Sequence, residues 1–207
     1  MKLHDVDQGS HEWYAIRAGV PTASEFSCVV TSKGERSKQL EGYAAQLAAE
    51  AYAKGPVDGW EGNAFTERGK ALEAEASNFY AFLMECTPEV VGFVTTDDGL
   101  YGCSPDRLIG DDGLLEIKCQ ASKGHVNTMM EYQKTGKLPP SYVQQVQGQL
   151  LVTGREWADV LFYHPKLPSI VIHATPDSVV QAGLIEHIPH LIEERDRVLS
   201  VILAAGN

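Results

Sequence analysis

Two carboxylates and one amine in the middle of the chain are spaced in a way that could support metal-dependent hydrolysis. Asp106 is followed ten residues later by Glu116-Ile117-Lys118. Side chains alternate along a β-strand, so Glu116 and Lys118 would share one face of a strand. An Asp at the end of the neighbouring strand could meet them there. We therefore treat these three side chains as one candidate site.

The chemistry of such a site would be that of a hard cation. Two carboxylates and an ammonium group are costly inside a protein unless they share an ion. Carboxylate and carbonyl oxygens together with water are the ligands that Mg²⁺ prefers. Lys118 could then orient or help deprotonate a water molecule, while the cation stabilises charge on a phosphoryl oxygen. The alternative is a surface salt bridge, because Glu-x-Lys is common on exposed strands.

A run of strand patterns is expected to position these residues. The pattern predicts a three-stranded antiparallel meander with turns at Asp98-Gly99 and at Asp111-Asp112-Gly113. Its strands cover residues 90–94, 100–110 and 114–119, and two more are expected at Trp157–Tyr163 and Ser169–Ala174. With helices on both sides in sequence, the fold class is α/β, with a central mixed β-sheet flanked by helices.

Helices are predicted from apolar periodicity and from capping patterns. A short helix follows Ser10 and includes Trp13 and Tyr14, which are expected to be core residues. Capping-box patterns at Thr22-Ala-Ser-Glu25 and Ser141-Tyr-Val-Gln144 predict two helix starts. The other helices are expected over Ser37–Lys54, from Asn63 to about Glu85, over Ser122–Tyr132, and from Asp177, the last kinked or divided at Pro189.

The composition limits the class of protein. The chain has 207 residues, of which 43% are hydrophobic, and no linker divides it, so a single domain over 1–207 is expected. No apolar run approaches the roughly 18–20 residues needed to cross a bilayer, and the first ten residues lack a signal peptide's apolar stretch. A cytoplasmic protein without membrane partners is expected. The four cysteines lie far apart in sequence and are expected to be reduced core residues.

The charge distribution leaves two interpretations open. The formal net charge is −11, which argues against binding a polyanion through overall charge. Thirteen of the 17 basic residues nevertheless lie within residues 1–140. They could form a local DNA-binding groove or could simply keep an acid-rich segment soluble.

Several motifs in the same order resemble a known nuclease family. Asp106 with Glu116-Ile117-Lys118 resembles the PD-(D/E)XK nuclease motif. The longer strings Gly102-Cys103-Ser104-Pro105-Asp106 and Leu115–Cys119 resemble the phage lambda-type exonuclease family, which includes viral recombinase and alkaline exonucleases. Further matching segments are Trp13-x-x-x-Arg17-x-Gly19, Thr22-Ala-Ser-Glu25, Gly69-Lys70-x-x-Glu73 and Tyr142-x-x-Gln145-Val146-Gln147. The matches extend from Trp13 to Gln147.

The resemblance implies a restriction-endonuclease-like core and a Mg²⁺-dependent 5′-to-3′ exonuclease. Such an enzyme processively degrades one strand of linear double-stranded DNA and leaves a 3′ single strand for recombination by strand annealing. It also implies two metal ions, with Mn²⁺ as the alternative to Mg²⁺, a homotrimeric ring around the DNA, and a single-strand annealing protein as partner. The enzyme would work in the cytoplasm of a bacterial host, encoded by a phage or prophage.

Carried over residue by residue, the resemblance implies two sets of site residues. Asp106, Glu116 and the Ile117 backbone carbonyl would bind metal, and Glu73 would complete the carboxylate set. Lys118 would position the attacking water, and Gln145 would help to place the water or the scissile phosphate. The terminal 5′ phosphate would be held by Arg17, Ser24 and Ser104.

Some alternatives remain open at this stage. The same fold could carry a structure-specific or site-specific endonuclease, or an inert protein that binds DNA ends. Glu73 alone would be read as an exposed glutamate, and Arg17 alone as a surface arginine. In the loop Lys54–Asn63 and just after it, Trp60 or Phe65 could be a wedge that splits the last base pair, or a packed aromatic residue.

Overall fold

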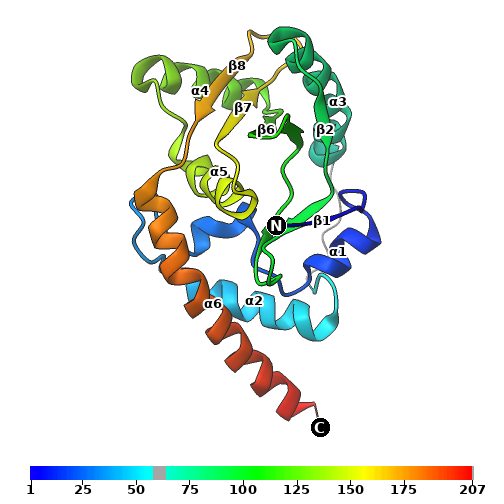
Figure 1. The fold of residues 1–207 in the computed structure, drawn as a ribbon, viewed down its shortest axis with the longest axis vertical. Helices are drawn as coiled ribbons and strands as arrows, with labels where there is room; N and C mark the ends of the chain where they lie inside the picture. Colours follow the sequence, from blue (N-terminus) through cyan, green and yellow to red (C-terminus); the bar gives the residue numbers. More distant parts are fainter. Residues whose placement is uncertain (58–63, 207) are drawn as a thin grey trace.

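Two β-sheets and the helices around them make up the part of the chain that the computed structural model describes, residues 1–57 and 64–206 (Figure 1). The strands are β1 (Lys2–His4), β2 (Pro88–Val90), β3 (Phe93–Thr95), β4 (Gly102–Cys103), β5 (Arg107–Ile109), β6 (Gly113–Lys118), β7 (Trp157–Phe162) and β8 (Ile170–Ala174). The helices are α1 (His11–Arg17), the 3₁₀ helix η1 (Ala23–Cys28), α2 (Leu40–Ala53), α3 (Ala64–Met84), α4 (Ser122–Thr135), α5 (Pro140–Thr153) and α6 (Ser178–Ala205).

The larger sheet confirms the predicted mixed architecture. Its strand order is β2-β5-β6-β7-β8; β6 and β7 are parallel, and the other neighbours are antiparallel. A parallel pair needs a crossover connection, which α4 and α5 supply between β6 and β7. The crossover places α5 against the face of the sheet that carries Glu116 and Lys118.

Alternation along β6 separates its side chains between two cores. Leu114 packs into the larger core, to which α5, α2, α6 and η1 contribute. Leu115 and Ile117 face the other way, into a smaller core with residues of α3. Glu116 and Lys118 therefore lie on the side of the sheet that α5 covers, as the strand periodicity predicts.

The predicted continuous meander is wrong in its pairing. Strands β3 and β4 belong to a separate three-stranded sheet with order β1-β3-β4, whereas β5 pairs with β2 and β6 in the larger sheet. The chain thus changes sheets between Cys103 and Arg107. This change places the Ser104-Pro105-Asp106 segment at the junction of the two sheets. The short strand β1, which no sequence pattern predicted, pairs with β3.

Neither of the two predicted capping boxes forms. Thr22 precedes only the six-residue 3₁₀ helix η1, and its hydroxyl makes no capping hydrogen bond. Helix α5 begins at Pro140, one residue before Ser141. Proline fits the first helical position because a backbone N–H there would have no acceptor within the helix. Helix α2 begins at Leu40 rather than Ser37. The predicted cap at Asn63 lies outside the described residues.

Other predicted helix ends are confirmed. The Ser10 hydroxyl accepts a hydrogen bond from the Trp13 N–H at 3.1 Å and caps α1. The Asp177 carboxylate caps α6 through the Val179 N–H at 2.9 Å. Helix α6 then continues through Pro189 without dividing, and it packs against α2 before its C-terminal end extends beyond the body (Figure 1).

Two expectations about burial are corrected. Trp13 and Tyr14 are only partly buried, since α1 has no fully buried residue. None of the four cysteines is joined in a disulfide, and of the four Cys103 alone is fully buried. Within the described residues, no helix combines the length and the apolar composition needed to span a membrane.

Candidate active site

Glu116 and Lys118 form an ion pair on the face of β6 that α5 covers. The Glu116 side chain is nearly inaccessible, with 4% of the residue surface exposed, and its Oε1 lies 2.7 Å from Lys118 Nζ. Burial by itself would lower the pKa of Lys118, but the adjacent Glu116 carboxylate outweighs that effect and the pKa is raised. Lys118 is therefore held as a cation and acts as a hydrogen-bond donor at neutral pH.

Asp106 reaches the same place from the junction between the sheets. Its Oδ2 accepts a hydrogen bond from the Ile117 backbone N–H at 2.5 Å, which fixes the carboxyl group beside β6. Burial raises the pKa of Asp106 well above its ordinary value, and the negative charge of Glu116 raises it further. The structure thus brings Asp106, Glu116 and Lys118 together, as the spacing in the sequence predicts.

Helix α5 contributes two glutamines that orient Glu116. Gln145 Nε2 donates to Glu116 Oε1 at 2.6 Å, and Gln145 Oε1 accepts from Lys118 Nζ at 3.1 Å. One helical turn later, Gln149 Nε2 donates to Glu116 Oε2 at 2.6 Å. Both carboxylate oxygens of Glu116 are therefore held by amide groups. Gln145 lies where the sequence predicts, whereas Gln149 was not among the predicted site residues, although its i, i+4 spacing from Gln145 was the available signal.

Glu73 lies near Asp106, but its carboxylate forms an ion pair with Arg107. Its Oε1 is 2.7 Å from the Arg107 guanidinium, which also donates to Ser77 Oγ at 3.2 Å. Throughout the described ranges, no group of three or more Asp, Glu, His or Cys side chains is arranged to hold a metal ion. The structure therefore pairs Glu73 with Arg107, the residue directly after Asp106, and does not group it with Asp106 and Glu116 in one three-carboxylate set.

The remaining donors are suited to a hard divalent cation. Asp106 and Glu116 are both carboxylates, and the negative charge of Glu116 is close enough to raise the pKa of Asp106 and disfavour its ionisation. A cation bound between them would relieve that repulsion, and oxygen donors are the type that Mg²⁺ or Mn²⁺ accepts. Asp106 and Glu116 are thus the side chains that would hold such an ion.

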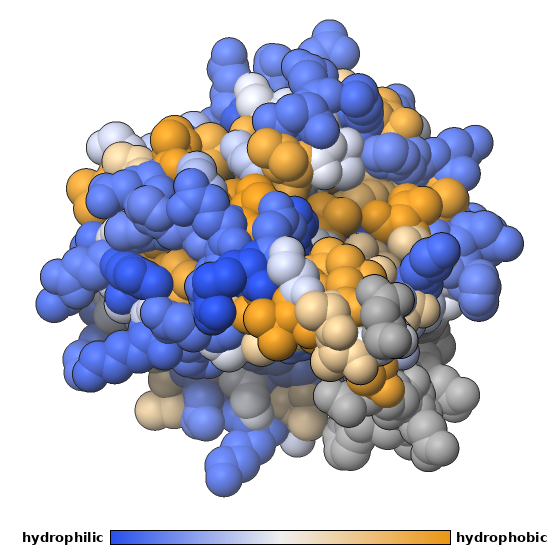
Figure 2. Space-filling model, turned by 90° about the horizontal axis from the view of Figure 1, so that it is seen from below, coloured by the Kyte–Doolittle hydropathy of each residue, from blue (hydrophilic) through white to orange (hydrophobic). Residues whose placement is uncertain are grey.

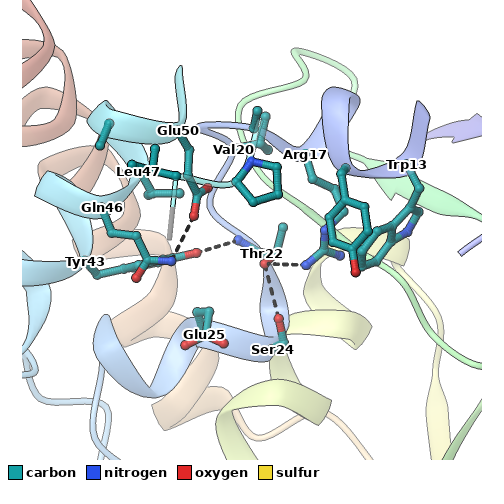
Figure 3. Close-up of a pocket in the computed structure, with 15 residues that line it drawn as sticks. Trp13, Arg17, Val20, Thr22, Ser24, Glu25, Tyr43, Gln46, Leu47 and Glu50 are labelled. Carbon is teal, nitrogen blue, oxygen red and sulfur yellow. Dashed lines mark hydrogen bonds between the residues drawn. The ribbon is translucent and has the colours of Figure 1, made fainter. Parts of the chain in front are cut away.

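A second cluster surrounds the guanidinium group of Arg17. Arg17 donates to Ser104 Oγ at 3.2 Å. It also donates to Thr22 Oγ1 at 3.3 Å, and Thr22 Oγ1 lies 3.2 Å from Ser24 Oγ (Figure 3). The three residues predicted to hold a terminal phosphate are therefore neighbours. Thr22, which the sequence reasoning treated as a helix cap, links Arg17 to Ser24.

Trp13 fixes the direction of Arg17. The guanidinium carbon lies 3.9 Å from the centre of the Trp13 ring, and Trp13 Nε1 donates to the same Ser104 hydroxyl at 3.0 Å. Stacking on an aromatic face holds a guanidinium group while leaving its edge free for hydrogen bonds. Burial lowers the pKa of Arg17, but an arginine remains charged at any physiological pH. The cluster thus presents a fixed positive charge with hydroxyl groups beside it.

A small cavity joins the two clusters. Its volume is about 140 Å³, and its lining includes Arg17, Ser24, Ser104, Gln145 and Gln149. A larger cavity of about 560 Å³ also has Arg17 in its wall, together with Glu25, Tyr43 and Glu50 (Figure 3). Arg17 borders both spaces. We call Arg17, Ser24 and Ser104 the phosphate-type cluster. The smaller cavity provides a direct path from this cluster to Gln145 and Gln149, the residues that orient Glu116.

Two aromatic residues are predicted as alternatives for a wedge that splits the last base pair. Trp60 and the side chain of Phe65 lie outside the described part of the chain.

Solved structures of exonucleases are similar to this chain over most of its length. The solved structure of an alkaline exonuclease, LHK-Exo from Laribacter hongkongensis, superimposes with a TM-score of 0.81 at 29% identity, covering 95% of this chain and 98% of that one. The same exonuclease has been solved in complex with dAMP, at 28% identity. A phage-related exonuclease from Haemophilus somnus 129PT shares the fold, with a TM-score of 0.63 and 13% identity over 91% of this chain and 96% of that one. No curated protein is a significant match.

The match to a protein family covers both clusters. Residues 12–156, more than half of the chain, match the YqaJ-like viral recombinase domain. This range contains Arg17, Asp106, Glu116, Lys118 and Gln145. The chain therefore belongs to the YqaJ-like viral recombinase domain family.

Proposed function

We propose that the protein is a metal-dependent exonuclease that degrades the 5′-ended strand of linear double-stranded DNA. The observation that carries the proposal is the convergence of Asp106, Glu116, Lys118 and Gln145 beside a cavity that leads to Arg17. The similarity to an alkaline exonuclease over nearly the whole chain supports it.

The proposed reaction is hydrolysis of a phosphodiester bond. Lys118, held as a cation, and the Gln145 amide orient a water molecule toward the phosphorus atom. Attack by this water forms a new P–O bond and breaks the bond to the 3′ oxygen, which leaves with a proton as a 3′-hydroxyl. Asp106, Glu116 and the Ile117 carbonyl would hold the cations, Mg²⁺ or Mn²⁺ and two in number, whose chemistry is to stabilise charge on the phosphoryl oxygens.

The second cluster, around Arg17, supports the proposed 5′-to-3′ polarity of digestion. A phosphate bound by Arg17, Ser24 and Ser104 would be the 5′ phosphate at the end of the strand, because charge-assisted hydrogen bonds from arginine suit a terminal phosphate dianion. The small cavity then accommodates part of the end nucleotide, with the next phosphate at the carboxylates. Each cycle releases one nucleotide and creates a new 5′ phosphate.

A ring of three copies would make this digestion processive, and a single-strand annealing protein would receive the 3′ strand. Exposed apolar side chains support burial against further copies. The exposed residues belong to the ends of α2 and α6 or follow them; they are Tyr52, Val57, Val201 and Leu203. These helix ends lie toward the face shown in Figure 2, on which hydrophobic and hydrophilic groups are mixed. The proposed setting is the cytoplasm of a bacterial host.

The test is time-resolved digestion of linear and covalently closed duplex DNA, labelled at the 5′ or 3′ end, with and without Mg²⁺. We expect loss of the 5′ label first, only on linear DNA and only with the metal. Lys118→Met should lower the rate by about 10²–10³-fold, the usual effect of removing one donor to developing charge. Exposed Lys137, changed to Met, serves as the matched control.

Two results would refute the proposal. Cleavage of closed circular DNA would favour an endonuclease on the same fold. Tight binding of DNA ends without any digestion would favour an inert end-binding protein. Full activity of the Asp106→Ala variant would contradict the assignment of the site even if the wild type were an exonuclease.

A further inference from the structure

Gln149 has a polar atom that the rest of the protein leaves unsatisfied. The residue is 1% exposed, and its Oε1 is buried without a hydrogen-bond partner among the described residues. Buried side-chain oxygens nearly always have a partner, and leaving one unpaired is destabilising. A buried carbonyl of this kind indicates a hydrogen-bond donor that the polypeptide itself does not supply.

The orientation of the amide is fixed by its other end. Gln149 Nε2 lies 2.6 Å from Glu116 Oε2, so exchanging the nitrogen and oxygen would place two acceptors against each other. The Gln149 carbonyl must therefore point away from Glu116. Gln145 provides the contrast, because its amide also donates to Glu116 while its carbonyl accepts from Lys118. Of these two glutamines, only Gln149 has a free acceptor.

The space that Gln149 lines can hold the missing donor. The small cavity is about 140 Å³ in volume and has Arg17, Ser24 and Ser104 in its wall as well as Gln145 and Gln149. A water molecule needs roughly 30 Å³ of liquid volume and two to four polar partners, and a polar cavity of this size meets both conditions. The cavity also extends from the phosphate-type cluster to the amides that hold Glu116.

We propose that Gln149 is a positioning residue of the active site, which orients Glu116 through its amide N–H and holds an ordered water in the cavity through its carbonyl. It acts through Glu116 and the water. The inference deepens the proposed function, because it takes Glu116 to be part of the hydrolytic site.

Another glutamine on the same helix offers a matched control. Gln147 is 4% exposed; its Nε2 donates to the Thr175 carbonyl at 2.9 Å, and its Oε1 accepts from the Asp177 N–H at 2.7 Å. It anchors α5 to the start of α6 and is absent from the lining of the small cavity. Gln147→Met and Gln149→Met each replace a buried amide by an apolar chain of similar size, so both variants lose the polar contacts of that amide.

The first measurement is a crystal structure of the wild-type full chain at a resolution that shows water molecules. We expect a water about 2.7–3.2 Å from Gln149 Oε1. The absence of a water molecule within hydrogen-bond distance of Gln149 Oε1 would overturn the inference. This result does not depend on whether any variant folds.

The second measurement is Mn²⁺ binding by calorimetry without DNA, followed by steady-state kinetics on linear duplex. Loss of a residue that orients a metal ligand typically costs about 10–100-fold in affinity or activity, so we expect weaker Mn²⁺ binding and a lower kcat for Gln149→Met, with KM for DNA ends nearly unchanged. Gln147→Met should lower thermal stability but leave Mn²⁺ affinity unaltered. Wild-type affinity and kcat in Gln149→Met would overturn the inference. Failure of the proposed function would instead appear as wild-type protein that digests no duplex.

Discussion

The carboxyl group of Asp106 is the most instructive one to neutralise, because stability and activity should change in opposite directions. Asp106 accepts the Ile117 N–H through Oδ2, and an amide at this position retains an oxygen for that bond. Burial and the charge of Glu116 raise the pKa of Asp106, since both disfavour its ionised form. We therefore expect Asp106→Asn to stabilise the fold when divalent cations are absent, and to abolish nuclease activity when Mg²⁺ is present.

The sign of the pH dependence follows from the raised pKa. The folded protein binds the Asp106 proton more tightly than the unfolded chain does, so this contribution to stability is complete below the ordinary carboxyl pKa of about 4. It is lost as the pH rises through the raised pKa. Above that range, removing a buried carboxylate charge should stabilise the protein by about 1–3 kcal/mol. In a domain of this size each kcal/mol raises Tm by about 2–4 °C.

The assay is thermal unfolding of wild type and variant over a pH series, first with a chelator and then with Mg²⁺. With the chelator, only the wild type should lose this contribution as the pH rises, and the variant should have the higher Tm at alkaline pH. Added Mg²⁺ should raise the Tm of the wild type, because a ligand that binds only the folded state stabilises it, and should have little effect on the variant.

Asp98 provides a control of opposite sign. It is an exposed turn residue whose pKa is lowered, first by the Thr96 hydroxyl and then by the Leu100 N–H. Its contribution to stability is present above the ordinary pKa and is lost as the pH falls, so Asp98→Asn should be slightly destabilising at alkaline pH. The reasoning about Asp106 is refuted if Asp106→Asn lowers Tm in the chelator at alkaline pH, or if Mg²⁺ stabilises both proteins equally.

Three further predictions concern other parts of the molecule. Duplex with a 5′ phosphate should be digested faster than 5′-hydroxyl duplex. Arg17→Ala should reduce that preference about tenfold or more, since hydrogen bonds to charged groups contribute about 1.5–3 kcal/mol. Equal rates on both kinds of end in the wild type would refute the proposed phosphate site. Gly148→Ala would place a methyl group 2.3 Å from the Phe26 ring, so Tm should fall with a loss of about 1–3 kcal/mol, and an unchanged Tm would show that α5 can shift freely. Pro189→Ala should stabilise the fold by up to about 3 kcal/mol and so raise Tm, because it restores a backbone donor inside α6. A lower Tm would mean that the proline ring makes a needed contact.

The part of the site that lies on one strand could be predicted from the sequence. Alternation alone puts Glu116 and Lys118 on the same face of β6, and the structure has them there as an ion pair. Gln145 and Gln149 likewise share a face of α5 because they are four residues apart. In both cases the geometry depends only on the period of a single element.

The pairing of strands could not be predicted in the same way. The residues of β3, β4 and β5 all have strand-like patterns, but such a pattern does not specify a partner, so the change of sheet between Cys103 and Arg107 was missed. That change is what brings Asp106 to the backbone of Ile117. The pairing of Arg107 with Glu73 was missed for a similar reason, since the two residues are far apart in sequence and meet only where α3 packs on the sheet.

The hydrogen bonds of the two acids determine which one is more available to a cation. An ionised carboxylate has about four acceptor positions. Glu116 uses three of them for Lys118, Gln145 and Gln149, whereas Asp106 uses one for the Ile117 N–H. The pKa of Asp106 is also raised, because burial and the charge of Glu116 disfavour its ionised form more than its hydrogen bond stabilises it. Glu116 is thus the fixed centre that aligns Lys118 and both amides, and Asp106 is the acid with most of its acceptor positions still available.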